Sequence, residues 1–285
     1  MRDLGRRVAA VTGSGSGIGR AIALDLARRG SCLALADVDG QGLAETVDRC
    51  TRAGATVTAH CLDVADRQAV HAWADTVVDE HGRVELVVNN AGVALGATVE
   101  AMSYEDFAWL MEINFWGVVH GTKAFLPHLK AAGEGHVVNL SSVFGLISVP
   151  SQSAYNASKF AVRGFTDALR MELAIEGSGV SCTTVHPGGV RTAIARNARM
   201  DGSVTALAGD PESARDGFDR VAITSPERAA RQILAAVERD RRRVLVGPDA
   251  AVIDVLARLP AGLYQSLIVA GARRRVRRAG GGGHR

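Results

Sequence analysis

The sequence has few cysteines and no long apolar run. Its 285 residues include 4 cysteines, Cys32, Cys50, Cys61 and Cys182, with no C-x-x-C pair and no zinc-type spacing. This excludes a disulfide framework and a zinc module, and it favours reduced thiols in a cytosolic protein. The absence of any run of about eighteen apolar residues argues against a membrane-spanning helix. The N-terminus MRDLGRRVAA passes directly from charged residues into a short apolar run, so no secretory signal is expected.

Acidic residues are absent from the last thirteen positions, which hold Arg273, Arg274, Arg275, Arg277, Arg278 and Arg285. The whole chain has a formal net charge of +3, so removing these six arginines leaves +3 − 6 = −3. The sequence pI of about 8.8 therefore reflects a basic tail. A nucleic-acid-binding face is not indicated.

Short apolar runs alternate with amphipathic helical patterns along the chain, without internal repeats. The runs are rich in β-branched residues and mostly do not alternate with polar residues, which is typical of strands buried on both faces. They fall at 8–11, 32–36, 56–62, 84–88, 136–140, 180–185 and 244–246, with helical patterns at 17–29, 41–53, 67–81, 104–132, 153–176 and 226–239. This order predicts an α/β fold: a doubly wound, Rossmann-type parallel sheet of about seven strands with helices on both faces.

We expect one catalytic domain over 1–250, followed by an apolar helix and a basic tail over 251–285. The segment 190–224 lacks a strong apolar period, and an irregular segment of that length within a compact domain is typical of a substrate lid. A surface insertion without a function is the alternative. The glycine run 280–283 predicts a short disordered stretch.

A glycine-rich turn lies between the first strand and the first helix, in the stretch VTGSGSGIGRAI. The pattern G-x-G-x-x-G fails, because it meets Ile18 when begun at Gly13 and Arg20 when begun at Gly15. The spacing that does fit is Thr12-Gly13-x-x-x-Gly17-x-Gly19. Free N–H groups at a helix N-terminus attract a pyrophosphate, and glycine lets the backbone approach it closely. A purely structural turn is the alternative. Because the pattern does not use Gly15, we expect that position to tolerate alanine best of the four glycines if its φ is negative, whereas a side chain at Gly13 or Gly19 should weaken dinucleotide binding.

The second strand ends in Asp37, eighteen residues after Gly19. A carboxylate there can accept hydrogen bonds from the adenosine ribose, and it would repel a 2′-phosphate. Neither Ser14 nor Val38 supplies a compensating cation, so NAD is favoured over NADP. An N-cap or turn role for Asp37 is the alternative.

Tyr155 and Lys159 stand four residues apart on a helical pattern and therefore share a face. A phenol is a poor base at neutral pH, and a nearby ammonium favours the phenolate. Lowering the phenol pKa by about three units takes roughly 4 kcal/mol. Alone, this pair is equally compatible with two exposed surface residues.

Together with other motifs in order, the chain resembles a short-chain dehydrogenase/reductase of about 250 residues. The motifs are Thr12-Gly-x-x-x-Gly-x-Gly, Asp63-Val64, Asn89-Asn90-Ala91-Gly92, Asn114, Asn139-Leu140-Ser141-Ser142, Tyr155-x-x-x-Lys159 and Pro187-Gly188. The likeness covers about residues 5–250. It implies a catalytic tetrad of Asn114, Ser142, Tyr155 and Lys159. It also implies cofactor contacts at Gly13, Ser16, Gly17, Ile18, Gly19, Asp37, Asp63, Val64, Asn90, Ala91, Gly92, Tyr155, Lys159, Pro187, Gly188, Val190 and Thr192.

The resemblance implies NAD-dependent interconversion of a secondary alcohol and a ketone, with Tyr155 as acid/base, Lys159 lowering its pKa, Ser142 binding the substrate oxygen and Asn114 holding a water. It also implies a homodimer or homotetramer. His186 stands outside the tetrad, and no metal spacing occurs among the eight histidines, so no metal is expected. The alternatives are an epimerase or dehydratase relative, which the loop pattern and the short C-terminal part disfavour, and a non-catalytic NAD(H)-binding regulator, which the complete tetrad disfavours.

Apolar residues at the predicted pocket favour a hydrophobic alcohol or ketone, and the lid arginines weaken that inference. They are Val93, Ala94, Leu95, Val143, Phe144, Leu146 and Val149. The apolar stretch 250–272 ahead of the arginines could lie on an anionic membrane surface, which would make the protein cytoplasmic and membrane-peripheral. A helix packed on the body or on a neighbouring subunit, with a solvated tail, is the alternative.

Overall fold

The computed structural model describes residues 3–208 and 222–280. Its centre is a seven-stranded sheet in the order β3-β2-β1-β4-β6-β7-β9, and every neighbouring pair is parallel. The strands are β1 (Val8–Thr12), β2 (Cys32–Asp37), β3 (Val57–Cys61), β4 (Leu86–Asn89), β6 (Gly135–Leu140), β7 (Val180–Pro187) and β9 (Arg243–Val246). The order reverses direction between β1 and β4, so the predicted doubly wound α/β fold is confirmed.

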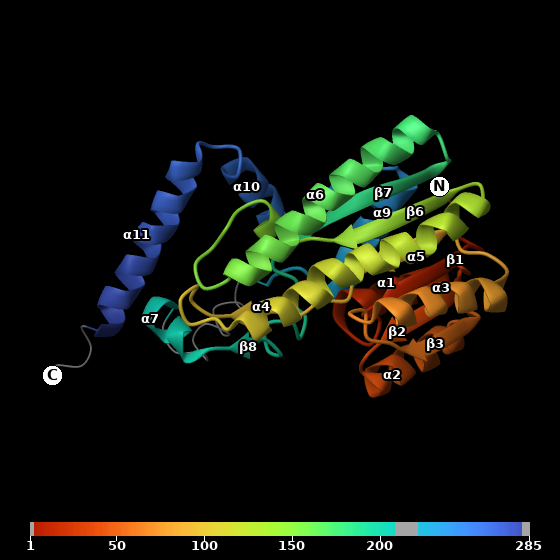
Figure 1. Ribbon diagram of the computed structural model, residues 1–285, viewed down its shortest axis with the longest axis horizontal. Coiled ribbons are helices and arrows are strands. Elements are labelled where there is room, and N and C mark those ends of the chain that lie inside the picture. The colour runs from red at the N-terminus through yellow and green to blue at the C-terminus, as the bar shows by residue number, and fades with distance from the viewer. Residues whose placement is uncertain (1–2, 209–221, 281–285) are drawn as a thin grey trace.

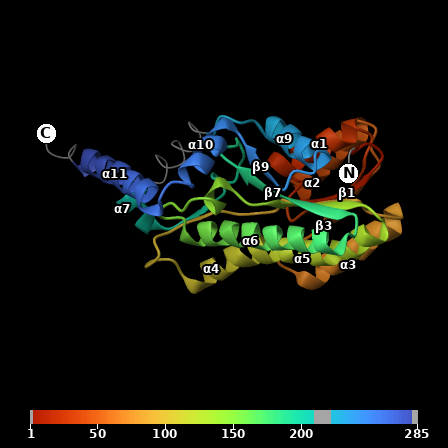
Figure 2. The same cartoon turned by 90° about the horizontal axis from the view of Figure 1, so that it is seen from above.

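Helices cover both faces of this sheet (Figure 2). The helices α1 (Gly17–Arg28), α2 (Gly40–Arg52) and α9 (Pro226–Glu238) lie on one face, while α3 (Arg67–His81), α5 (Gly117–Ala131) and α6 (Ser153–Glu176) lie on the other. Two separate cores result. Alternate residues of each strand point to opposite faces, so Val11 and Leu35 join the first core, and Ala10 and Ala34 join the second. Burial on both faces explains why these strands read as continuous apolar runs.

The helical pattern expected over 104–132 is one helix interrupted by a wider turn. It consists of α4 (Tyr104–Met111), a π-helical segment η1 (Glu112–Trp116) and α5. A π turn adds a residue and re-aims the side chain it carries, and such turns often mark functional sites. Here that side chain is the fully buried Asn114.

The carboxyl edge of the sheet carries the remaining short elements. A 3-10 turn, η2 (Val143–Gly145), follows β6, and a two-stranded parallel pair joins β5 (Leu95–Gly96) to β8 (Arg199–Met200). Then come η3 (Gly202–Val204) and α7 (Thr205–Ala208). The part of the expected lid at 209–221 lies outside the described residues. In the described part, Arg199 binds Asp106 at 2.8 Å and lies over the Trp109 ring at 3.6 Å.

Two helices end the described chain, α10 (Pro248–Leu256) and α11 (Ala261–Gly280), where the sequence suggested one apolar stretch. The break falls at Pro260. The buried carboxylate of Asp254 pairs with Arg243 and Arg258, which attaches α10 to the body. α11 stands away from the sheet beside α7 (Figure 1). Within the described ranges, no helix combines the length and the apolar character needed to cross a bilayer.

Candidate active site

The glycine-rich turn between β1 and α1 leaves no room for side chains. Gly13 and Gly17 have φ values of +64° and +53°, a region that L side chains rarely adopt. A Cβ on Gly13 would lie 2.7 Å from Ala91 Cα, and one on Gly19 would overlap the Gly13 carbonyl oxygen. These glycines are therefore required by the close approach of neighbouring backbone.

The N-terminus of α1 lacks a side-chain cap at Ser16. By contrast, Asp39, Asp66 and Ser225 cap α2, α3 and α9. The first N–H groups of a helix have no partner within it, and with the helix dipole they form an anion site. The uncapped end at Ser16, Gly17 and Ile18 therefore fits a pyrophosphate group.

The segment after β4 is bonded directly to this turn. Thr12 Oγ1 accepts hydrogen bonds from the N–H groups of Asn90 at 3.0 Å and Ala91 at 3.2 Å. Asn90 Nδ2 donates to the carbonyl oxygens of Thr12 at 3.0 Å and Gly13 at 2.9 Å. The expected contact residues Asn90, Ala91 and Gly92 are thus brought against the glycine-rich turn, with its backbone fixed by protein atoms alone.

Asp37 lies at the end of β2 and is engaged on both carboxylate oxygens. Oδ2 accepts from Gly15 N at 2.7 Å, and Oδ1 accepts from Asp39 N at 2.9 Å. The φ of Gly15 is not positive, as its expected tolerance of alanine requires. A Cβ there would lie 2.8 Å from Asp37 Oδ2 and 3.2 Å from Leu43 N, so the Asp37 carboxylate would have to shift. At Gly13 and Gly19 a Cβ would instead meet backbone atoms more closely, so the expectation that Gly15 tolerates alanine best stays a prediction.

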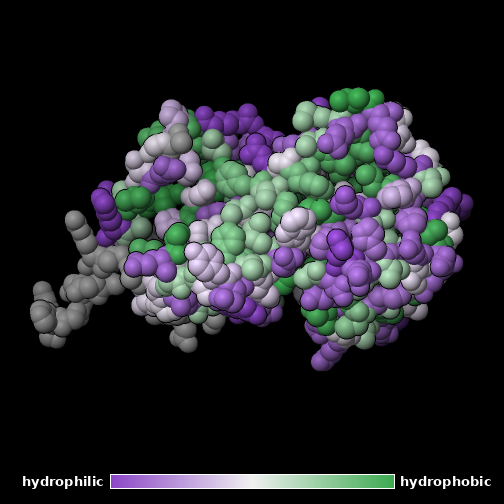
Figure 3. All heavy atoms as spheres, viewed as in Figure 1, coloured by the Kyte–Doolittle hydropathy of each residue, from purple (hydrophilic) through white to green (hydrophobic). Residues whose placement is uncertain are grey.

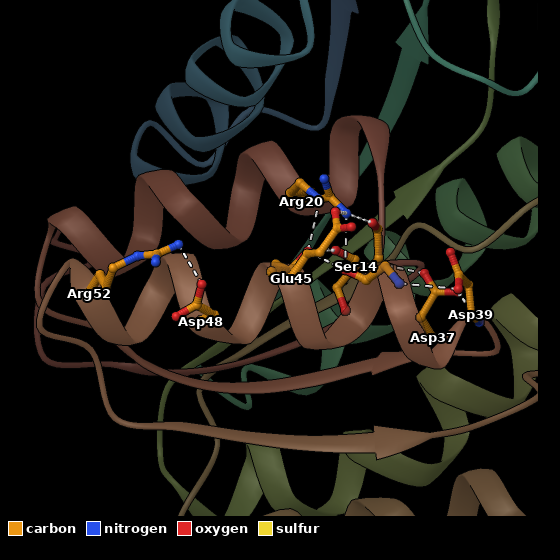
Figure 4. A network of polar contacts seen from close by, with 10 residues as sticks. Ser14, Arg20, Asp37, Asp39, Glu45, Asp48 and Arg52 are labelled. Atoms are coloured by element: carbon orange, nitrogen blue, oxygen red, sulfur yellow. Dashed lines mark hydrogen bonds and ion pairs between the residues drawn. The ribbon is translucent and has the colours of Figure 1, made fainter.

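Arg20 is a residue that the sequence reasoning missed (Figure 4). From α1, its guanidinium reaches the carbonyl oxygens of Gly15 and Gly42, the carboxylate of Glu45 at 3.1 Å and Thr46 Oγ1 at 2.9 Å. It therefore ties the glycine-rich turn to α2, and its charge is paired with Glu45. The only signal in the sequence was a cation directly after the last glycine, which predicts no partner by itself.

Asp63 and Val64 follow β3 at the same edge of the sheet. Asp63 Oδ1 accepts from Ala65 N at 2.9 Å, which forms a local turn. Val64 is buried, and its carbonyl oxygen bonds His120 Nδ1 at 3.2 Å. A Cβ on Gly117 would lie 2.7 Å from Val64 Cγ2, so α5 packs directly on this segment.

The four expected catalytic residues come from three parts of the chain: Asn114 from η1, Ser142 from the turn between β6 and η2, and Tyr155 and Lys159 from one face of α6. Lys159 is 4% exposed, and its Nζ donates to Leu140 O at 3.0 Å and lies 5.5 Å from the centre of the Tyr155 ring. The Tyr155 ring packs edge-on against Phe144, with a centroid distance of 6.1 Å. The tetrad is thus gathered at the carboxyl edge of the sheet.

Burial dominates the ionisation of this pair. It raises the pKa of Tyr155 to about 12, against the opposing effect of a hydrogen bond from Ser142. It lowers the pKa of Lys159 to about 8. The Lys159 ammonium lies near the Tyr155 ring, and the expectation that it lowers the pKa of Tyr155 stays a prediction. Lowering the phenol pKa from about 12 to about 7 takes about 7 kcal/mol of differential stabilisation.

Asn114 holds the backbone that follows the Asn-Asn-Ala-Gly motif. Its Oδ1 accepts from Val93 N at 2.8 Å, and its Nδ2 donates to Val93 O at 2.9 Å. A Cβ on Gly92 would lie 3.1 Å from Asn114 Oδ1 and 3.7 Å from Lys159 Nζ. Gly92 is therefore the narrow point between the two side chains, and the expected role of Asn114 in holding a water stays a prediction.

His186 supports Ser142 from the neighbouring strand. It is 1% exposed, and its Nδ1 lies 3.0 Å from the carbonyl oxygen of Ser142, so we assign a donor proton to Nδ1. Burial lowers the pKa of His186 to about 4, and the ring is neutral at physiological pH. The sequence reasoning placed His186 outside the tetrad, and the structure shows it bonded to the backbone of a tetrad residue.

The loop after β7 completes the edge. Gly188 N donates to Val246 O at 2.9 Å, and Val190 forms a bridge with Thr224. The methyl carbon of Thr192 would lie 3.1 Å from a Cβ on Gly17. The expected contact residues Pro187, Gly188, Val190 and Thr192 therefore extend from the tetrad back to the glycine-rich turn.

The sequence predicts that the site holds no metal. Across 3–208 and 222–280, no three His, Cys, Asp or Glu side chains gather as metal ligands. The four cysteines carry free thiols.

A family model described as short chain dehydrogenase matches residues 7–202. The oxidoreductase SadH of Mycobacterium tuberculosis is 51% identical over 95% of this chain and 97% of its own length. A short-chain dehydrogenase/reductase from Burkholderia phymatum, solved with NAD, is 34% identical, with a TM-score of 0.81 over 89% of this chain and 93% of that one. An alcohol dehydrogenase from Thermococcus sibiricus, solved with 5-hydroxy-NADP, is 28% identical, with a TM-score of 0.69 over 84% and 95% of the two chains.

The two solved relatives are matched over most of their length, and both are complexes with a nicotinamide dinucleotide. The chain belongs to the short-chain dehydrogenase/reductase family of oxidoreductases.

Proposed function

We propose that this protein is an NAD-dependent oxidoreductase that interconverts a secondary alcohol and a ketone, with Tyr155 as acid/base. The observation that carries the proposal is the buried Tyr155–Lys159 pair beside Ser142, at the edge where the glycine-rich turn also lies. A buried acid/base pair with shifted pKa values at the carboxyl end of a doubly wound sheet is typical of a catalytic site.

Each member of the tetrad has a distinct task. The phenol of Tyr155 takes the proton of the substrate hydroxyl in oxidation and returns it in reduction. Ser142 hydrogen-bonds the substrate oxygen. The Lys159 ammonium, which holds its proton below about pH 8, supplies the positive charge that favours the phenolate. Asn114 fixes Val93 at the pocket wall. The nicotinamide supplies the hydride acceptor or donor when bound.

NAD is preferred over NADP in this proposal. The Asp37 carboxylate lies at the end of β2, where the adenosine ribose of a dinucleotide is expected. Arg20 is the nearby cation, and its charge is already paired with Glu45, so a 2′-phosphate would meet the Asp37 carboxylate without compensation.

The substrate is proposed to be hydrophobic. Tyr155 and Val93 pack against a cluster containing Leu95, Leu110 and Ala154, so the acid/base group stands in apolar surroundings. Val143 and Leu146, two of the expected pocket residues, are 6% and 7% exposed and contribute mainly to packing.

The chain is proposed to divide into a catalytic domain over 1–250, with a substrate lid at 190–224, and a C-terminal segment over 251–285.

We also propose a cytoplasmic homodimer or homotetramer. Large apolar side chains on the long helices remain exposed in the single chain: Trp116, Met171 and Ile175 are 44%, 57% and 88% exposed. Burying such residues between subunits removes apolar surface from water, which favours association.

The C-terminal helices are proposed to allow peripheral contact with an anionic membrane. Val252, Val255, Leu263 and Leu267 are exposed on α10 and α11, and Figure 3 shows hydrophobic side chains at that end of the molecule. The arginines that begin at Arg273 follow directly, and apolar area next to a basic cluster is the combination that anionic lipid surfaces attract. If deletion of 260–285 left sedimentation with anionic liposomes unchanged, this contact would be refuted.

The function is tested by following the absorbance of reduced nicotinamide with NAD and a panel of hydrophobic secondary alcohols. We expect turnover with at least one member of the panel and its loss in Tyr155→Phe. A protein that binds NAD tightly, is inert to the whole panel and is unchanged by that substitution would contradict the enzyme proposal and favour a regulator.

A further inference from the structure

The turn after β9 lies beside the loop after β7, and the two are joined by one side chain. Parallel pairing aligns Pro187 with Val246, so the chain leaves both strands at the same edge of the sheet. Asp249, in the first turn of α10, turns back toward the neighbouring loop. Its Oδ2 accepts a hydrogen bond from Gly189 N at 2.6 Å. A carboxylate that accepts from a backbone N–H makes a short, charge-assisted bond.

The other hydrogen bonds that the described residues make to the loop 187–190 come from backbone groups. Gly188 N donates to Val246 O at 2.9 Å, and Thr224 N donates to Gly189 O at 3.1 Å. Both of those bonds depend only on strand geometry, and any residue type can make them. Among the described residues, Asp249 supplies the side-chain hydrogen bond to this loop.

Packing around Asp249 explains two glycines. A Cβ on Gly188 would overlap the Asp249 carboxyl group. Gly247, whose φ is +94°, leaves space that a Cβ would fill at 2.5 Å from Asp249 Oδ1. The carboxylate therefore occupies the volume that side chains at 188 and 247 would need. Gly188 therefore packs directly against Asp249, and it also precedes Gly189, whose N–H bonds the Asp249 carboxylate.

The second oxygen of Asp249 takes no part in the bond to Gly189. Oδ1 is buried and, within the described part of the chain, has no hydrogen-bond partner; the same holds for Thr224 Oγ1. Both atoms border the space that a Cβ on Gly247 would fill. The Asp249 carboxylate lies in the first turn of α10, where the positive end of the helix dipole favours a negative charge.

We propose that Asp249 is a positioning residue for the nicotinamide half of the cofactor. By fixing Gly189 N it sets the course of the loop that carries Pro187, Gly188 and Val190. This inference rests on the proposed function, in which that loop lines the nicotinamide. Asp249 follows β9, and four strands separate β9 from β2, where Asp37 marks the adenosine end, so we expect its effect to be confined to one half of the dinucleotide.

The test compares NAD with ADP-ribose, which lacks the nicotinamide, by calorimetric titration of the full chain. In Asp249→Ala we expect NAD binding to weaken about tenfold, the usual effect of losing a hydrogen bond to a charged group, with ADP-ribose binding unchanged. Asp249→Asn keeps an acceptor oxygen and is expected to restore most of the NAD affinity. Asp254→Asn, on the same helix but paired with Arg243, is the matched control and should leave the NAD to ADP-ribose ratio unchanged.

A second pair of variants keeps the proposal testable if single changes destabilise the fold. Gly188→Ala forces its new Cβ against the Asp249 carboxyl group, whereas in the Gly188→Ala, Asp249→Ala double variant that group is gone. We therefore expect non-additive losses of NAD affinity. Equal weakening of NAD and ADP-ribose, no change of either, or strictly additive losses would overturn the role of Asp249. Failure of the wild-type chain to bind NAD would instead overturn the proposed function.

Discussion

The two ends of the site are constructed in opposite ways. At the phosphate end, the glycine-rich turn is fixed by protein atoms alone: Thr12, Asn90, Asp37 and Arg20 bond its backbone or its neighbours. At the chemical end, Tyr155 and Lys159 are buried ionisable groups whose pKa values are shifted against charge, to about 12 and about 8. The first end has a bonded backbone and an uncapped helix N-terminus that can receive an anion, whereas at neutral pH the second end holds a neutral Tyr155 and a protonated Lys159.

This difference teaches that binding and chemistry can fail separately. Preorganised backbone supplies affinity, because little has to be reordered when an anion arrives. Ionising a buried side chain such as Tyr155 instead costs several kcal/mol, and a nearby positive charge lowers this cost. Substitutions at the phosphate end should therefore affect binding first, and those at the chemical end should affect turnover first.

The largest expected effect is at Lys159. Lys159→Met removes the ammonium that favours the phenolate and the bond to Leu140 O, so we expect turnover to fall by about a thousandfold. Initial rates at saturating NAD measure this loss. Lys130→Met, which removes an exposed lysine paired with Glu176, is the control. If turnover of Lys159→Met fell by less than tenfold, the assignment of chemistry to this end and of binding to the phosphate end would be contradicted.

Gly19→Ala should affect the other end. Its Cβ would overlap the Gly13 carbonyl oxygen, so the turn must shift, and we expect NAD affinity to fall by about a hundredfold or more. Calorimetric titration measures the affinity, and thermal unfolding reports the stability. Gly164→Ala, in open space on α6, is the control and should be neutral or stabilising by up to about 1 kcal/mol. Unchanged NAD affinity in Gly19→Ala would refute the tight turn.

Acid should weaken the fold through two buried histidines, His136 near the start of β6 and His186 beside Ser142. Burial lowers the pKa of His136 to about 3 and of His186 to about 4, both below the unfolded value of 6.5. Because the unfolded chain binds the extra protons, stability is fully present above pH 6.5 and falls as pH decreases toward 4. Each histidine is expected to remove about 2 kcal/mol of unfolding free energy between pH 6.5 and 5.

Urea unfolding at several pH values checks this slope. His186→Gln keeps a donor for the Ser142 carbonyl and should remove about half of the acid-dependent loss. The exposed His71 offers a control substitution with no effect on the slope. An acid profile that His186→Gln leaves unchanged would contradict the buried neutral ring.

The smallest effect is expected at Asp37. Asp37→Ser removes the carboxylate that repels a 2′-phosphate, and we expect the ratio of NADP to NAD affinity to rise about tenfold. The Gly15 N–H loses its acceptor in the same variant, so NAD binding should also weaken slightly. Competition titrations with both dinucleotides measure the ratio. An unchanged ratio would show that Asp37 does not face the 2′ position.

The sequence was sufficient for the fold class because its strands are buried on both faces and read as apolar runs. The importance of Gly13 and Gly17, which adopt a positive φ, could also be predicted from the sequence, because their spacing is typical of a strand-to-helix turn. The course of the chain at Asn114 was not, because a π turn leaves the helical pattern almost unchanged over five residues.

Contacts across long stretches of sequence explain the remaining gaps. The contact between Gly15 and the Asp37 carboxylate could not be predicted, because Asp37 lies 22 residues further along the chain, at the end of β2. Arg20 and Asp249 were missed for the same reason: their partners lie on α2 and in the loop after β7. Local sequence preferences predict that a segment forms a turn or a helix. They do not predict which carboxylate from a distant part of the chain packs beside that turn or helix.

The most direct test measures NAD affinity and turnover together in Tyr155→Phe and Gly19→Ala. The separation of the two ends predicts that Tyr155→Phe binds NAD as the wild-type chain does while losing its activity toward secondary alcohols. It also predicts that Gly19→Ala loses NAD affinity and regains turnover as NAD is raised. If Tyr155→Phe kept its turnover, or if Gly19→Ala bound NAD normally, the central claim would be contradicted.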